Sequence, residues 1–396
     1  MNGIRYGGDS MQGLWLRCVR AAAGATVILL AACGSGETTP GTVRFALTDA
    51  PACGFDQVNV SIERIRVHRD ASANENATGW TDLRLSPARR IDLLKLGNGV
   101  LEELGQLSLP AGKFAQLRLV LAANGSGTPA NSVVPTDGVE TALEIPGSVQ
   151  GGISVAYAFS VSEDKVTDVL FDFDACRSVV SSGSSSYVLK PAVKAVPRSG
   201  ATITGYVDAQ LTGVTVAAQK DGSEARATVA DANGRFVIAF LDTAQSPYDI
   251  VITAAGRATA VVSAVPVSTS AATELSRIDA PITMPEATDR TASGTIGPTA
   301  ARSTAVVRAR QVIGSAGQVE IARANGNYTT GAYSLSLPTA RPRLAAYSSK
   351  LPLSFSAAGN AAQYVLDATA DGYVAQLREI DLATSSATWS PTLARQ

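Results

Sequence analysis

The sequence predicts an all-β protein: an N-terminal β-sandwich or barrel-like domain followed by two small β-sandwiches. Three observations carry this prediction. Short segments of alternating apolar and polar residues recur along the chain, which is the period of a half-buried strand. Turn-forming residues separate them, with 35 Gly and 18 Pro among the 396 residues. Segments with helical periodicity are few, so strands are expected to form the core.

Residues 1–32 have the pattern of a secretory signal peptide. Arg17 and Arg20 precede a run of about a dozen apolar or small residues, shorter than the roughly 20 that a membrane-spanning helix needs. Met11 is an alternative start of the same signal. Residues 33–41 then read as a flexible tether, because GSGETTPG is small and polar.

The segment Leu30-Ala31-Ala32-Cys33 resembles the lipobox of bacterial lipoproteins. In that family the cysteine is acylated after the signal is removed, so the resemblance implies a membrane anchor at Cys33. Residue 34 is Gly rather than Asp, which in Gram-negative lipoproteins implies the outer membrane, facing the periplasm or the cell surface. An ordinary cleaved signal with an incidental cysteine is the alternative.

Composition excludes some classes of binding partner and indicates the cellular compartment. The net charge is −1 and charged residues make up 17%, so neither nucleic acid nor a basic membrane patch is expected. Cys53 and Cys176 remain once the signal and the anchor are set aside, and an oxidising compartment favours a disulfide between them. Closing that loop of roughly 120 residues would stabilise the fold by ~2–4 kcal/mol. Two separately buried thiols are the alternative.

Residues 42–198 contain eight or so predicted strands. The first, TVRFALTDAP, alternates apolar and polar residues and turns at 49–51. In QVNVSIERIRVHR the pattern slips between Ile62 and Ile65, which predicts a β-bulge or a change of face. Residues 101–122 predict a hairpin with its turn at 110–112. Strands at this spacing fit a sandwich or a closed barrel.

Five motifs in this domain are LTDAP, RRIDLLKL, LPAGKFAQLRL, LFDFDACRSV and YVLKPAV. Together they resemble a bacterial lipoprotein family that is defined by an N-terminal domain of unknown function. The resemblance implies a β-rich domain over most of 42–198 and no particular reaction.

Four side chains in this domain are candidate ligand contacts. Asp172 and Asp174 share one face of a strand and, with Asp49, offer the oxygen ligands that calcium prefers. The alternative is a solvated strand face or the capping of a turn. Trp80 is either a platform for stacking a sugar or a hydrophobic plug. The chain has no CxxC and no Cys/His cluster, so zinc is not expected, and no cofactor is predicted.

Residues 199–285 form the next predicted module, with tight turns at 221–222 and 231–234. GYV, ADANGRF and ITAAGRATAVV follow one another in an order that resembles the carboxypeptidase regulatory-like domain. The resemblance implies a small transthyretin-like sandwich, related to carbohydrate-binding folds.

Residues 288–396 repeat this order, since ASGTIGP parallels ITGYVDA and STAVVRARQV parallels GVTVAAQ. They predict a divergent second copy; a chance alignment of β-rich sequence is the alternative.

The sequence lacks the common catalytic motifs, which argues against an enzyme. His68 is the single histidine and no Gly-x-Ser-x-Gly elbow accompanies it. A carboxylate pair of a cryptic glycoside hydrolase is the remaining enzymatic alternative. We therefore expect a lipid-anchored envelope protein that binds or assembles, with carbohydrate as the most concrete ligand for its sandwiches. A purely structural spacer with a protein partner is the alternative.

Overall fold

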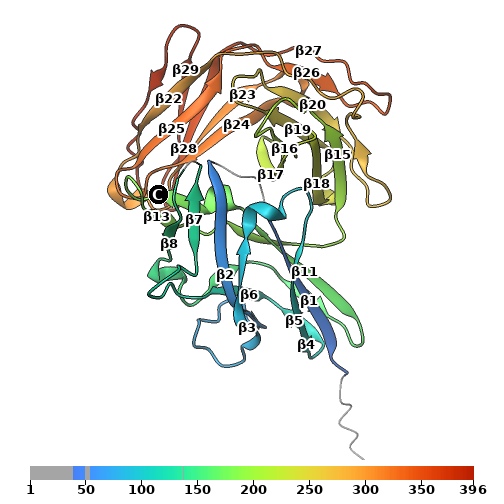
Figure 1. Ribbon diagram of the computed structural model, residues 1–396, viewed down its shortest axis with the longest axis vertical. Coiled ribbons are helices and arrows are strands. Elements are labelled where there is room, and N and C mark those ends of the chain that lie inside the picture. Colours follow the sequence, from blue (N-terminus) through green and yellow to red (C-terminus); the bar gives the residue numbers. More distant parts are fainter. Residues whose placement is uncertain (1–38, 50–53, 137) are drawn as a thin grey trace, which may run out of the picture. The chain divides into compact units, whose positions relative to one another are not determined.

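The computed structural model describes residues 39–49, 54–136 and 138–396, and strands dominate them (Figure 1). The all-β prediction is confirmed, because α1 (Ala175–Ser178) is the one α-helix in these ranges. Among the described residues, no helix is long and apolar enough to cross a membrane. All of them belong to one compact unit that contains three hydrophobic cores, so this unit is expected to fold without residues 1–37.

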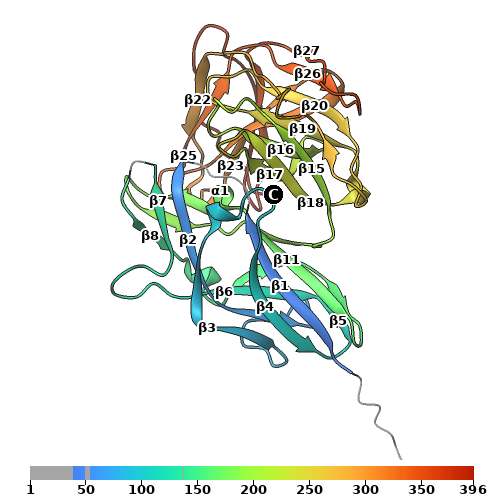
Figure 2. The ribbon, with the colours of Figure 1, turned by 45° about the vertical axis from the view of Figure 1, so that its right-hand side comes forward.

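The first domain packs two main sheets around one core, as Figures 1 and 2 show. One sheet has the order β14-β11-β1-β4, and the other has the order β12-β13-β8-β7-β2-β6-β9 with β3 beside β2. A third pair joins β5 and β10. The strands are β1 (Gly41–Asp49), β2 (Phe55–His68), β3 (Thr81–Asp92), β4 (Glu102–Leu109), β5 (Gly112–Phe114), β6 (Gln116–Leu121), β7 (Ser132–Pro135), β8 (Thr141–Glu144), β9 (Ile153–Val155), β10 (Phe159–Val161), β11 (Val166–Phe173), β12 (Val179–Ser181), β13 (Tyr187–Leu189) and β14 (Val193–Val196), with 3₁₀ turns η1 (Leu93–Leu96) and η2 (Gly147–Val149).

The predicted bulge in β2 is confirmed. The register shifts between Ile62 and Arg64 in the pairing with β3 and again in the pairing with β6. Ile62 and Ile65 are therefore both fully buried in the core, although they lie an odd number of positions apart. The extra residue of the bulge changes the face of the sheet to which the side chains in the second half of β2 point.

The predicted hairpin over residues 101–122 is wrong. β4 pairs with β1, β5 pairs with β10, and β6 pairs with β2 and β9. The chain crosses between the two sheets at residues 110–112, where Pro110 cannot donate a hydrogen bond and Gly112 has φ 135°. Leu109, Phe114 and Leu117 all reach the common core from there, so the apolar alternation is satisfied without a hairpin.

The first sandwich follows, with sheets β18-β15-β21 and β17-β16-β19-β20. Its elements are β15 (Ala201–Tyr206), β16 (Thr215–Lys220), β17 (Ser223–Val229), β18 (Arg235–Leu241), η3 (Thr243–Gln245), β19 (Tyr248–Thr253), β20 (Ala260–Val265) and β21 (Thr273–Glu274). Both predicted turns are confirmed. Asp221 and Gly222 have φ of 50° and 68°, which is the conformation of a two-residue hairpin turn, and Gly234 N–H donates to the Asp231 carbonyl at 2.8 Å.

The second sandwich has the same strand order as the first. In each, the first strand pairs antiparallel with the fourth and parallel with the last, as an internal repeat would. Its sheets are β25-β22-β30 and β24-β23-β28-β29. Its elements are β22 (Asp289–Thr295), η4 (Thr299–Ala301), β23 (Val306–Val312), η5 (Gly314–Ala316), β24 (Gln318–Asn325), β25 (Ala332–Pro338), β28 (Gln363–Thr369), β29 (Gln376–Asp381) and β30 (Ala387–Thr388).

One segment of the second sandwich leaves its own module. β26 (Arg343–Ala346) pairs in parallel with β20 of the first sandwich and carries β27 (Ser356–Ala357) at the sheet edge. Val251 and Val261 of the first sandwich in turn belong to the core of the second. The two sandwiches thus share both a sheet and a core boundary, which the sequence pattern did not predict.

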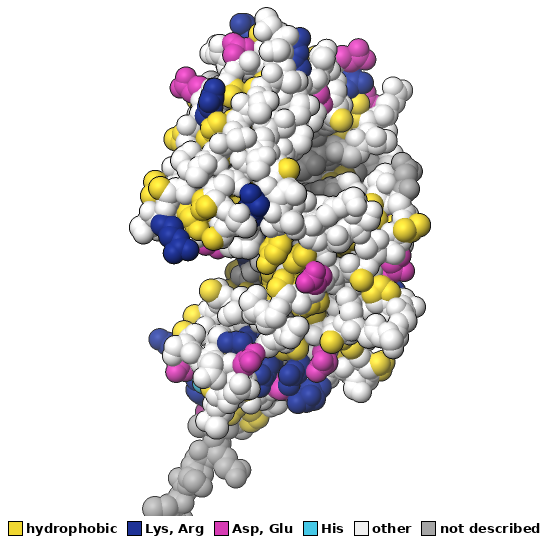
Figure 3. All heavy atoms as spheres, turned by 90° about the vertical axis from the view of Figure 1, so that its left-hand side faces the viewer, with side chains coloured by type: hydrophobic (Ala, Val, Ile, Leu, Met, Phe, Trp, Pro, Cys, Tyr) yellow, Lys and Arg dark blue, Asp and Glu magenta, His cyan; other side chains and the backbone are white. Residues whose placement is uncertain are grey.

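Charge is unevenly distributed over the surface. Figure 3 shows basic and acidic side chains crowded together over the lower, first-domain part of the face drawn there. Most ion pairs of that domain lie on β2, β3 and their neighbours.

Candidate functional site

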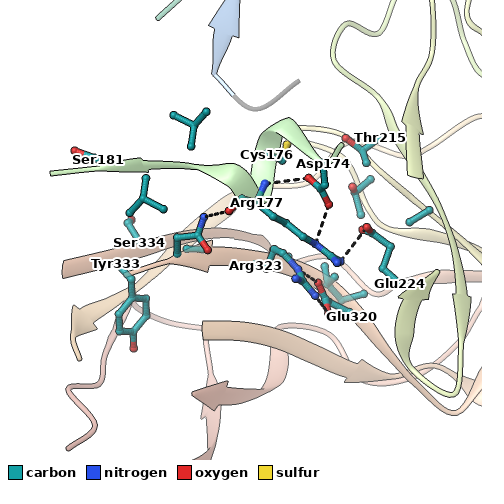
Figure 4. Close-up of a pocket in the computed structure, with 18 of the residues that line it drawn as sticks. Asp174, Cys176, Arg177, Ser181, Thr215, Glu224, Glu320, Arg323, Tyr333 and Ser334 are labelled. Atoms are coloured by element: carbon teal, nitrogen blue, oxygen red, sulfur yellow. Dashed lines mark hydrogen bonds and ion pairs between the residues drawn. The ribbon is translucent and has the colours of Figure 1, made fainter. Parts of the chain in front are cut away.

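A cavity of about 750 Å³ lies where the first domain meets both sandwiches (Figure 4). We call it the junction cavity. Its walls come from residues 174–181 around α1, from β16, β17 and β19 of the first sandwich, and from β24 and β25 of the second. Cavities at module interfaces are common ligand sites. It is therefore the first place to look for function.

Arg177 joins two modules on one side of this cavity. Asp174 follows β11 and caps α1, since its Oδ1 accepts a hydrogen bond from the Arg177 amide at 2.9 Å. The Arg177 guanidinium then lies 3.0 Å from Asp174 Oδ2 and donates through Nη2 to Glu224 Oε1 at 2.9 Å. One guanidinium thus bridges carboxylates from the first domain and from β17 (Figure 4).

A second arginine–carboxylate pair comes from β24. Arg323 contacts Glu320 through Nε at 2.5 Å and through Nη2 at 2.8 Å, the bidentate arrangement that orients a guanidinium best. Gln219 of β16 fixes this strand, because its amide donates to the Glu320 carbonyl at 2.7 Å and accepts from the Glu320 N–H at 2.9 Å. Gln219 therefore docks the strand that carries Glu320 and Arg323 against β16.

Burial perturbs the charged groups around the cavity. Desolvation raises the pKa of Asp174 and of Glu224, although the charge of Arg177 opposes the shift in both. Desolvation also lowers the pKa of Lys190 to about 8, and its Nζ lies 3.5 Å from Asn325 Oδ1. Such perturbed groups in a cavity are typical of functional sites, and structural ion pairs also produce them.

The charges of the lining nearly cancel. Among the residues that line the cavity, Asp174, Glu224 and Glu320 face Arg177 and Arg323, and the Lys190 amine lies beside Asn325 at the rim. The cavity therefore offers hydrogen-bond donors and acceptors in similar number without a strong field of either sign.

The structure places the three predicted aspartates against separate partners. Asp172 Oδ2 lies 2.8 Å from Arg226 Nη1 of β17, and both residues are buried. Asp49 Oδ1 accepts from the Ala175 N–H at 2.9 Å. With Asp174 capping α1, no group of three or more metal-ligating side chains forms among the described residues. The arrangement matches the capping alternative for Asp174.

Trp80 lies outside the set of residues that line the junction cavity. Its Nε1 donates to the Asn74 carbonyl at 2.9 Å. Two guanidinium groups, of Arg66 and Arg118, lie 4.9 and 5.3 Å from its ring centroid, and the His68 ring lies 5.0 Å away. The half-buried ring is therefore already occupied by protein cations, unlike a bare sugar platform.

The predicted cysteine chemistry falls mostly beyond the described ranges. Cys33 and Cys53 lie outside the described residues, so the lipid anchor and the Cys53–Cys176 disulfide stay predictions. Cys176 lies on α1 and lines the junction cavity. A disulfide there would tie down the helix that presents Arg177.

Sequence reasoning missed the residues that define the cavity. Arg177 lies within the motif LFDFDACRSV, which the sequence analysis singled out. The pairing of Arg177 with carboxylates of two modules was not predicted. Glu224, Glu320 and Arg323 sit on ordinary alternating strands, where a charged residue normally marks the solvent face. These three side chains line the cavity only because the modules pack against one another.

The comparisons with known proteins concern the first domain. A search of the curated proteins finds no match to this chain. Residues 40–191 match the model of a family described as a domain of unknown function (DUF4382). This confirms the predicted N-terminal domain of unknown function, whereas the resemblances to lipoproteins and to carboxypeptidase regulatory-like domains stay predictions. The matched residues include α1 and Arg177.

Proposed function

We propose that this protein is a lipid-anchored, non-catalytic binding protein of the bacterial cell envelope, and that the junction cavity holds its ligand. One observation carries the proposal: three modules converge on a cavity whose charged groups are held in fixed pairs. A preformed cavity of this size, with charged and amide groups set among apolar side chains, suits a small molecule or one end of a chain molecule.

The lining favours a neutral, hydroxyl-rich ligand, and carbohydrate is the proposed class. Carboxylates, guanidinium groups and the amides of Asn325 and Asn327 provide both donors and acceptors. Their charges nearly cancel, so an anion or a cation gains little there. Tyr187 adds an aromatic ring to the wall, which can pack against a sugar face.

A glycoside hydrolase is the second candidate, because the cavity contains carboxyl groups with raised pKa. Desolvation raises the pKa of both Asp174 and Glu224, as in a general acid. Arg177 however contacts both carboxylates, which keeps them as paired acceptors. Binding without turnover is therefore the preferred proposal.

The ligand test is a glycan array followed by calorimetry with the unit from residue 38 onward. Glu224→Gln and Arg323→Gln are expected to weaken binding of any glycan that the wild type binds by about tenfold, since each removes a charge-assisted hydrogen bond. Arg378→Gln on the exposed strand β29 is the matched control. Release of reducing sugar that Glu224→Gln abolishes would favour the hydrolase instead.

The structural-scaffold alternative rests on the sheet that the two sandwiches share through β20 and β26. A chain that binds no glycan, while a pull-down from the native envelope returns one specific protein, would favour that alternative.

The anchor has its own test. Cys33→Ser is expected to move the protein from the membrane fraction to the soluble fraction, and intact mass should show acyl chains on wild-type Cys33 only. A variant that still fractionates with membranes would contradict the lipoprotein proposal and leave the cavity proposal unaffected.

A further inference from the structure

We propose that the outer face of β2, β3 and β6 carries a second binding site, which takes a phosphate group of an acidic ligand. We call it the arginine face and define it by Arg64, Arg66, Arg84 and Arg118. None of these residues lines the junction cavity, so the two proposals stand or fall separately.

Strand register places like charges opposite each other on this face. Arg64 of β2 pairs directly with Arg84 of β3, and Arg66 of β2 pairs directly with Arg118 of β6. Like charges opposite each other destabilise a sheet, whereas opposite charges stabilise it. Two such pairs in neighbouring rows therefore need a counter-charge between them.

The described residues supply that counter-charge only in part. Asp82 is the shared partner: its carboxylate lies 2.9 Å from Arg66, 3.4 Å from Arg64 and 3.6 Å from Arg84. Glu63 reaches Arg64 only at 3.8 Å and is 44% exposed. Three guanidinium groups thus share two carboxylates, no described carboxylate forms an ion pair with Arg118, and the face keeps a net positive charge.

Donors on this face also remain unused. The Arg64 side chain is 25% exposed and donates one long hydrogen bond, from Nη1 to Asp82 Oδ2 at 3.4 Å. The Arg84 side chain is 65% exposed and approaches Asp82 at 3.6 Å only, beyond normal hydrogen-bond distance. A guanidinium carries five N–H donors and no acceptor, so Arg64 and Arg84 can contact an anion without leaving Asp82.

The other two arginines are held in place by the loop between β2 and β3. Arg66 donates to the Glu75 carbonyl at 2.8 Å, and Arg118 donates to the Ala73 carbonyl at 3.1 Å. Both also pack against Trp80. We assign Trp80 the role of fixing two charges beside Arg64 and Arg84 on the same face, so that little side-chain ordering is left for binding.

Phosphate is the chemistry that fits best. The planar fork of a guanidinium matches phosphate oxygens in a bidentate manner, and a phosphate monoester carries close to two negative charges at neutral pH, which balances the excess charge of the face. The phosphate can belong to a lipid headgroup or to a soluble molecule; the recognition is the same and the experiment separates the two.

The test titrates the unit from residue 38 onward with pyrophosphate, in a phosphate-free buffer of low salt at neutral pH. The wild type is expected to bind it with an affinity that falls as salt rises. Arg64→Gln with Arg84→Gln should weaken binding at least about tenfold, which corresponds to ~1.4 kcal/mol. Arg378→Gln on β29 should bind like the wild type.

A second readout uses Arg84→Gln alone, because that side chain is 65% exposed and its ion pair with Asp82 is long, at 3.6 Å. Without ligand, this variant should have an unchanged or higher melting temperature, since it removes a like charge opposite Arg64. Pyrophosphate should raise the melting temperature of the wild type and not that of the variant. A purely structural role for Arg84 predicts the reverse: a lower melting temperature and an unchanged response to pyrophosphate.

Sedimentation with vesicles identifies the source of the phosphate. Sedimentation with phosphatidylglycerol vesicles, not with phosphatidylcholine vesicles, and its loss in Arg84→Gln, would assign a lipid headgroup. Pyrophosphate binding without sedimentation would assign a soluble phosphate ligand. Absence of both in the wild type, or equal binding by the double variant, overturns the proposal.

Discussion

Replacing Lys190 by Met should stabilise the protein at neutral pH. Lys190 follows β13 and points its amine at the boundary of the first domain and the second sandwich, 3.4 Å from the Ala305 carbonyl and 3.5 Å from Asn325 Oδ1. Both contacts are long, so they compensate the buried charge poorly. Methionine has a similar length and no charge.

The magnitude follows from the pKa of this amine. Burial lowers the pKa of Lys190 from 10.5 to about 8, so folding destabilises the charged amine relative to the neutral amine by roughly 3 kcal/mol. The side chain is not fully enclosed and Asp371 attracts its charge. We therefore expect Lys190→Met to raise the free energy of unfolding at pH 7 by about 1–2 kcal/mol.

The sign of the pH dependence is fixed by linkage. Between pH 8 and 10.5 the unfolded chain binds the proton on residue 190 more tightly than the folded chain does. The wild-type free energy of unfolding therefore rises through this window. The advantage of the variant should be largest below pH 8 and should vanish near pH 10.5.

Urea denaturation at pH 7 and pH 10 measures the difference in free energy of unfolding between the wild type and Lys190→Met. The other titrating groups are the same in both proteins, so their contributions cancel in this difference. Lys190→Arg, which keeps its charge at both pH values, is the control and should be less stable than the methionine variant throughout. A methionine variant that is less stable than the wild type at pH 7 would refute the reasoning, because the ammonium contacts would then outweigh its burial.

Three further predictions concern other parts of the fold. Burial raises the pKa of Glu224 above its ordinary value of about 4.5, so its contribution to stability is complete at low pH and is lost as the pH rises through its folded pKa. Glu224→Gln should therefore flatten the dependence of the free energy of unfolding on pH above about 4.5. Gly222→Ala should cost about 1–3 kcal/mol, because φ is 68° and a Cβ would strike the Gln318 carbonyl; Gly213→Ala, with φ 64° and open space around it, should cost less, and equal losses would mean that the contact is irrelevant. Cys53 and Cys176 should resist alkylation in the unfolded, non-reduced protein, and Cys176→Ser should lower the free energy of unfolding by ~2–4 kcal/mol; modification of both thiols would exclude the disulfide.

Local features of the fold were predictable, because neighbouring residues determine them. The slip between Ile62 and Ile65 marks the bulge of β2, and Asp221-Gly222 marks the turn between β16 and β17. In both cases side-chain period or backbone preference within a few residues decides the geometry.

The incorrect prediction of a hairpin over residues 101–122 shows a limit of inference from local sequence. Apolar alternation tells which side chains are buried and does not tell which strand is the partner. Leu109 and Phe114 do reach the core as their spacing implies, yet their strands pair with β1 and β10.

The junction cavity could not be predicted from the sequence, because local patterns do not tell which distant segments become neighbours. Gln219 contacts Glu320 across 101 positions, and Asn325 donates to the Arg177 carbonyl across 148. Asp174 was noticed as a strand-end acid, but its partner Glu224 comes from another module. Only the docking of the modules makes these residues neighbours.

The strand that crosses between the sandwiches has a consequence for how the chain matures. β20 acquires its neighbour β26 only after some eighty more residues have been synthesised. An emerging first sandwich therefore exposes an unpaired, largely apolar border strand for that interval. A fragment that stops at residue 287 would keep this border permanently open and is expected to self-associate. Dissection of the protein into separately expressed modules must therefore keep residues 199–396 together.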